Sequence, residues 1–123
     1  MIPKFRAWDK TDKEMYLVDE INFNRGEFES IGDGITFLRG ADKVELMQST
    51  GLHDKNGKEI FEGDILGTND GLLDGVVKYR TDLGMWTNDL LRYNNFERLC
   101  SIANSREIIG NIYENPELLE VTK

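Results

Sequence analysis

The sequence has few residues of the kinds that build catalytic and metal sites. It contains one cysteine, Cys100, and one histidine, His53, among 123 residues. A single cysteine excludes a disulfide within the chain, as is usual in a reducing compartment, and the apolar neighbours of Cys100 favour a buried structural thiol. His53 flanks a turn, where a solvated side chain is the more common outcome. The sequence therefore predicts no enzymatic activity, no cofactor and no metal site.

Long apolar runs and positive charge are also scarce. No stretch approaches the roughly 20 apolar residues of a membrane span, and the N-terminal residues lack the apolar run of a signal peptide. We therefore expect a cytoplasmic protein without a membrane partner. Lys and Arg number 15 against 23 Asp and Glu, which gives a net charge of -8. Because phosphate contacts need cations, nucleic acid is not the expected ligand; the acidic surface serves solubility or meets a basic partner.

The apolar residues that are present recur mostly with a period of two, which is typical of half-buried strands. This pattern predicts strands over residues 4–8, 15–18, 44–47, 60–66, 76–80 and 108–113. A further hairpin is predicted between 21–23 and 28–31, and another strand over 35–38. The sequence thus predicts a mainly β fold with little helix. We expect a hairpin-rich N-terminal region, 1–43, followed by a second region, 44–123, that ends in a short helical turn.

Local signals mark the turns and the helical end of the chain. Asp54-Lys55-Asn56-Gly57 predicts a tight hairpin turn, because Asn and Gly both tolerate positive φ, and Gly63 predicts a bend in the strand that follows. Residues 88–104 leave two interpretations open, a short helix or two strands joined through Asn94 and Asn95. Asn115-Pro116-Glu117 predicts the start of a helix that the Asn115 side chain caps.

Two groups of residues are candidate binding sites. Leu72 and Leu73 lie in the Gly- and Asp-rich loop 67–74, where two adjacent leucines need cover from the core or from a neighbouring chain. Lys78 and Arg80, with aromatic residues such as Trp86, could form a platform on which single-stranded nucleic acid stacks. At a net charge of -8, the aromatic residues are better explained as core.

Four blocks of the sequence carry a family resemblance: residues 2–9 (IPKFRAWD), 50–65 (TGLHDKNGKEIFEGDI), 75–79 (GVVKY) and 107–118 (EIIGNIYENPEL). In content, order and spacing they resemble the YopX family of phage and prophage proteins, whereas residues 87–105 have no counterpart. The resemblance implies a small SH3-like β-barrel in the second region, a phage or prophage source in a bacterial host, and self-association. It implies no known activity.

The first interpretation is a non-enzymatic binding or assembly module that forms a homo-oligomer through Leu72 and Leu73. A second is an acidic modulator of a basic host or phage protein that binds nucleic acid. A third is a small barrel that itself binds nucleic acid weakly through Lys78, Arg80 and Trp86.

Overall fold

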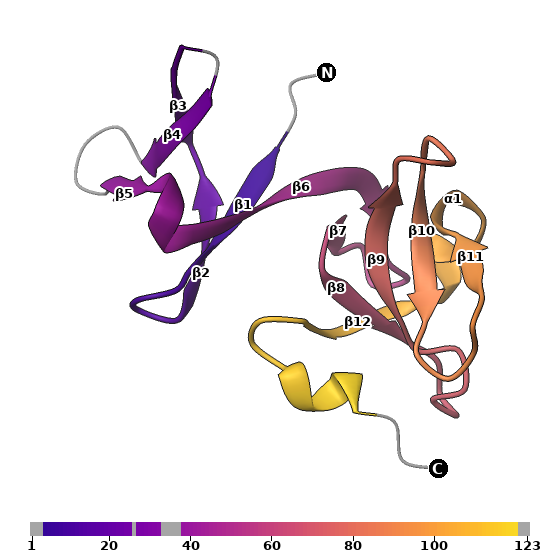
Figure 1. Ribbon diagram of the computed structural model, residues 1–123. Helices are drawn as coiled ribbons and strands as arrows, with labels where there is room; N and C mark the ends of the chain where they lie inside the picture. Colours follow the sequence, from indigo (N-terminus) through magenta and orange to yellow (C-terminus); the bar gives the residue numbers. More distant parts are fainter. Residues whose placement is uncertain (1–3, 26, 33–37, 121–123) are drawn as a thin grey trace. The chain divides into compact units, whose positions relative to one another are not determined.

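The computed structural model describes residues 4–25, 27–32 and 38–120 (Figure 1). The chain forms two compact units, Met1–Gln48 and Ser49–Lys123. Strands dominate both units, and the described residues contain one short α-helix, so the prediction of a mainly β fold with little helix is confirmed. The division predicted at residue 43 falls earlier than the observed one, because the residues from Val44 to Gln48 pair with the first strand of the chain.

The first unit contains two antiparallel sheets. One has β1 (Phe5–Asp9) between β2 (Glu14–Val18) and the start of β6 (Val44–His53), and the other joins β3 (Glu20–Asn24), β4 (Glu27–Gly32) and β5 (Leu38–Gly40). A 3-10 turn, η1 (Ala41–Lys43), leads into β6. Side chains from both sheets meet in one core, whose buried members are Ala7, Ile31 and Val44. The strand predicted over 35–38 lies mostly outside the described residues.

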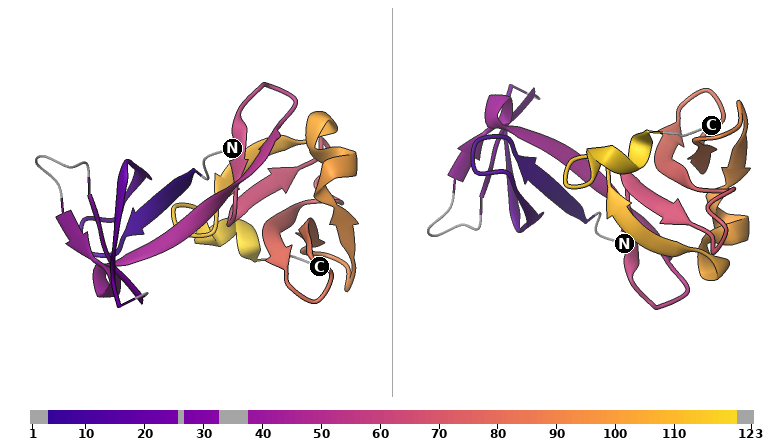
Figure 2. Two further views of the ribbon diagram at one scale, coloured as in Figure 1. Left: turned by 90° about the horizontal axis from the view of Figure 1, so that it is seen from above. Right: turned by 90° about the horizontal axis from the view of Figure 1, so that it is seen from below.

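The second unit is built on a five-stranded antiparallel sheet that curls into a half-barrel (Figures 1 and 2). Its strands, in spatial order, are β11 (Phe96–Arg98), β10 (Met85–Leu90), β9 (Gly75–Arg80), β8 (Asp64–Gly67) and β12 (Glu107–Asn111). The end of β6 pairs with β7 (Glu59–Phe61). The helices are α1 (Leu99–Ile102), η2 (Ala103–Ser105) and η3 (Pro116–Leu119). The buried core consists of Ile60, Leu66, Val77, Leu99 and Ala103.

Residues 88–104 contain parts of both predicted alternatives. β10 and β11 are joined by a loop that includes Asn94 and Asn95, and α1 follows β11 directly. The prediction of a buried Cys100 is wrong, because α1 turns Leu99 into the core and leaves Cys100 exposed. The short helix therefore presents its thiol to solvent.

The C-terminal part also differs from its prediction. β12 ends at Asn111 and not at residue 113, since the Asn111 side chain accepts the backbone N–H groups of Tyr113 and Glu114 and turns the chain. Pro116 does begin a helix, but it is a 3-10 helix. The predicted Asn115 side-chain cap is wrong, because its Oδ1 instead accepts from the backbone N–H of Asn111 at 3.2 Å.

Candidate functional site

The turn at Asp54–Gly57, inside the longest block of the family resemblance, is organised by one buried carboxylate. Asp54 is 4% exposed. Its Oδ1 accepts the backbone N–H groups of Asn56 and Lys58, both at 2.9 Å, and its Oδ2 accepts the N–H of Ile108 at 3.0 Å. Burial raises the pKa of Asp54, but these three donors outweigh it and hold the pKa below its usual value. Asp54 therefore ties its own turn to β12.

Gly57 closes the same turn. Its φ of 83° confirms the predicted positive φ, and its N–H donates to the Asp54 carbonyl at 3.0 Å. This bond, with Asp at the first position and Gly at the fourth, is typical of a type I turn followed by a left-handed residue. Glycine adopts that conformation without steric cost.

Two further glycines of the resemblance, one in the same block and one in the block 107–118, also have structural explanations. Gly63, with a φ of 86°, separates β7 from β8, and its N–H and carbonyl bond to Val77 and Ile112, both at 2.9 Å. A Cβ at Gly110 would lie 2.4 Å from the Asn115 Oδ1, so only glycine leaves room for the C-terminal turn. The residues that carry the family resemblance at these positions shape turns. A binding surface must therefore be sought elsewhere in the second unit.

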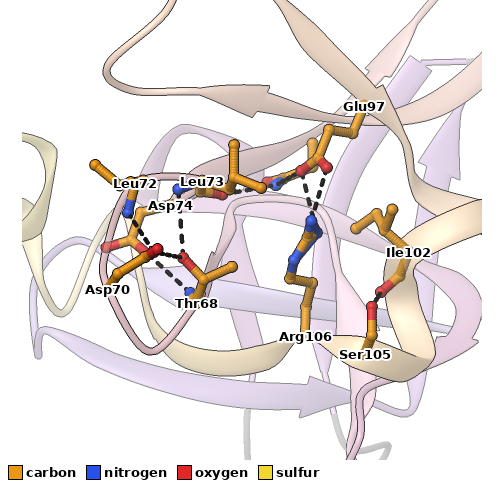
Figure 3. A network of polar contacts seen from close by, with 10 residues as sticks. Thr68, Asp70, Leu72, Leu73, Asp74, Glu97, Ile102, Ser105 and Arg106 are labelled. Carbon is orange, nitrogen blue, oxygen red and sulfur yellow. Dashed lines mark hydrogen bonds and ion pairs between the residues drawn. The ribbon is translucent and has the colours of Figure 1, made fainter.

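The loop between β8 and β9, residues 68–74, which we call the leucine loop, contains several hydrogen bonds between its own residues (Figure 3). The Asp70 Oδ1 accepts the Leu72 N–H at 3.0 Å and the Thr68 hydroxyl at 2.9 Å, and that hydroxyl oxygen accepts the Leu73 N–H at 3.3 Å. The Leu72 N–H, followed by the Thr68 hydroxyl, lowers the pKa of Asp70. The Thr68 N–H donates to the Asp74 Oδ1 at 3.0 Å, so both ends of the loop are joined.

The loop separates its two leucines. Leu72 is 46% exposed, whereas Leu73 is half-buried. The Leu73 carbonyl accepts from the Asn88 amide of β10 at 3.4 Å, and the Asp74 carbonyl accepts the Leu91 N–H at 2.9 Å. Of the two predicted contact residues, Leu72 is therefore the more exposed, and whether either contacts a neighbouring chain stays a prediction.

Ile109 is a second exposed apolar residue beside the leucine loop, and it was not among the residues predicted from the sequence. It is the extra residue of a β-bulge between Ile108 and Gly110, and it is 40% exposed. A Cβ at Gly67 would lie 3.0 Å from two Ile109 methyl carbons and 3.1 Å from the Asp74 Oδ1. Bulges redirect side chains in this way. The adjacent apolar pair Ile108 and Ile109 was the available signal, since a strand cannot bury both on one face.

The predicted nucleic-acid platform of Lys78, Arg80 and Trp86 is not assembled on one face of the sheet. Trp86 pairs with Tyr79, so both lie on the face opposite Lys78 and Arg80, and Trp86 packs against the core. Lys78 lies 3.9 Å from the Asp89 carboxylate. Arg80 donates two hydrogen bonds to Asp82, at 3.1 and 3.0 Å, and covers the Phe96 ring. Both cations thus already have acidic neighbours.

The remaining sequence candidates lie apart from these features. His53 is exposed at the end of β6. Within residues 4–25, 27–32 and 38–120, no group of three or more His, Cys, Asp or Glu side chains could hold a metal ion. In the same part of the chain, no helix has the length and apolarity needed to cross a membrane.

Comparisons with known proteins give a consistent family and fold. The family model described as YopX protein matches residues 4–120. Protein EF1440 from Enterococcus faecalis is 33% identical with a TM-score of 0.72, over 98% of this chain and 99% of that one. Protein yopX from Bacillus subtilis is 22% identical with a TM-score of 0.61, over 98% of each chain, and at that identity shows the fold alone. The curated proteins contain no match.

Proposed function

Because the chain belongs to the YopX family, we propose that it is a non-enzymatic accessory protein of a phage or prophage, which binds protein and assembles into a homo-oligomer in the bacterial cytoplasm. The observation that carries this proposal is the leucine loop. Its hydrogen bonds keep Leu72 exposed in one conformation. A preorganised loop loses little conformational entropy on binding, so burial of its apolar side chain contributes more fully to affinity.

The free energy that one buried leucine contributes to association is modest, but it is sufficient for assembly when it recurs at each interface. Burying the exposed part of a leucine yields about 1 kcal/mol, and full burial about 1.5–3 kcal/mol. In a symmetric assembly each chain contributes the same loop, so the gain recurs at each interface. Ile109, on the neighbouring bulge, supplies further apolar surface beside the loop.

The two alternative functions have less support from the structure. A nucleic-acid platform would need Lys78, Arg80 and Trp86 on one surface, but Trp86 lies on the opposite face and both cations are near carboxylates. An acidic modulator remains an outcome of the test below, because a basic partner could also cover Leu72.

The test is the mass in solution of the wild type, Leu72→Asp and Leu83→Asp by light scattering. Leu83 is the matched control, since it is 44% exposed and also lies in a turn, at the tip of the β9–β10 hairpin. We expect an oligomer for the wild type and for Leu83→Asp, and a smaller mass for Leu72→Asp with an unchanged circular dichroism spectrum. A wild type that is monomeric at high concentration would overturn the homo-oligomer. Capture of a basic host protein by that monomer, lost in Leu72→Asp, would then favour the acidic modulator.

A further inference from the structure

A largely buried polar network lies beside the leucine loop (Figure 3). Arg106 donates two hydrogen bonds to Glu97 of β11, from Nη1 to Oε1 at 3.1 Å and from Nη2 to Oε2 at 2.7 Å. The Asn88 amide donates to the same Glu97 Oε1 at 3.1 Å and to the Leu73 carbonyl at 3.4 Å. One asparagine side chain thus joins an ion pair on one side to the loop on the other.

The orientation of Asn88 is determined by its surroundings. Asn88 is fully buried, and the two hydrogen bonds that it donates require Nδ2 to face Glu97 and Leu73. Its Oδ1 lies 2.4 Å from the position that a Cβ at Gly75 would occupy, and it has no hydrogen-bond partner in the described residues. A flipped amide would set an oxygen against two acceptors, which is unfavourable. Because Gly75 has no Cβ, it leaves the space that the Asn88 amide occupies.

We propose that Asn88 is a positioning residue for the leucine loop, and that the Arg106–Glu97 ion pair holds Asn88 in place. The Arg106 side chain is 9% exposed and that of Glu97 19%, so their bidentate pair is little screened by water. Together with the Leu91 N–H on the Asp74 carbonyl, Asn88 anchors two successive carbonyls of the loop. That Asn88 affects association through Leu72 rests on the proposed function, whereas its effect on the conformation of the leucine loop does not.

The test is amide hydrogen exchange, measured by NMR at a concentration at which the chain is monomeric. The matched variants are Asn88→Ala and Asn111→Ala, since Asn111 is also buried in this unit but its side chain bonds to Tyr113 and Glu114 in the turn after β12. Because the Asn88–Leu73 bond is long, we expect Asn88→Ala to speed exchange at Leu72 and Leu73 by about two- to fivefold relative to Asn111→Ala. The amides of Asn56 and Lys58, held by Asp54, serve as internal references.

Equal exchange at Leu72 and Leu73 in the two variants would overturn the proposal. If Asn88→Ala does not fold, Arg106→Lys decides, because lysine keeps the charge but cannot form the bidentate pair. We then expect faster exchange at the same two amides, and unchanged rates would overturn the proposal. Failure of the proposed function can be distinguished from failure of the positioning role. A wild type that never associates would reject the homo-oligomer, but its amide exchange rates at Leu72 and Leu73 would still test the role of Asn88. A Leu72→Asp effect on mass with no Asn88→Ala effect on exchange would reject only the positioning role.

Discussion

Replacing Asp54 by alanine tests the structural account of the family block. The substitution removes the acceptor of three backbone N–H groups, at 2.9, 2.9 and 3.0 Å. The Asn56 and Lys58 donors lie in an exposed turn where water can replace the carboxylate, whereas Ile108 lies in a half-buried strand. Hydrogen bonds to a charged group contribute about 1.5–3 kcal/mol each, but bonds that share an acceptor are not additive. We expect Asp54→Ala to lower the free energy of unfolding by about 2–4 kcal/mol.

The assay must report on the second unit alone, because two compact units need not unfold together. The chain has two tryptophans, Trp8 in the first unit and Trp86 in the second. In a Trp8→Phe background, urea unfolding followed by fluorescence therefore reports on the surroundings of Trp86, which packs against the core of the second unit. A free energy of unfolding for Asp54→Ala within about 0.5 kcal/mol of that of its parent would refute the reasoning.

The pH dependence of the same transition gives an independent check. The pKa of Asp54 is lower in the folded chain than its usual value of 3.8. Its contribution to stability is therefore complete above the unfolded pKa and is lost as the pH falls through the folded pKa. We expect the stability difference between Asp54 and Asp54→Ala chains to shrink as the pH is lowered below about 4.

Three further outcomes follow from single positions. Gly57→Val should cost about 1–3 kcal/mol in the same urea assay through backbone strain alone, since φ is 83° and, apart from its chain neighbours, no described residue lies within 4 Å of the added Cβ; an unchanged midpoint would contradict the turn. Gly75→Ala should also lower the midpoint, because its Cβ would lie 2.4 Å from the Asn88 Oδ1 and 2.7 Å from the Asp89 carbonyl, and a wild-type midpoint would argue against this packing. Cys100 is exposed, so a thiol reagent should label the folded chain rapidly, and protection until denaturant is added would contradict the orientation of α1.

The strands and turns were predictable because their signals are local. Alternating apolar residues predicted β1, β2 and β9, and the Asn56-Gly57 pair predicted the turn with its positive φ. A short helix was one of two interpretations of residues 88–104, but the position of α1 was not predictable, since four residues are too few to show a helical period. Cys100 was misplaced for the same reason: in a single turn of helix, an apolar neighbourhood does not tell which side chain faces the core.

The sequence proposed Leu72 and Leu73 as contact residues, which stays a prediction, and the arrangement of the two side chains was not predictable. Two adjacent leucines in a polar loop led us to expect a contact, but the hydrogen bonds of Asp70 and Thr68 determine which leucine is the more exposed. Asn88 joins parts of the chain that are far apart in sequence, Leu73 and Glu97. Single polar residues at such separations carry no periodic signal, and only the folded sheet brings them together.

The most direct test of the central claim is the NMR signal of the Leu72 methyl groups as the wild-type chain is concentrated. The account predicts that these signals shift or broaden with concentration, because Leu72 enters a contact between copies, while those of the equally exposed Leu83 stay unchanged. Leu72 signals that do not depend on concentration, or changes that appear at Leu83 instead, would contradict it.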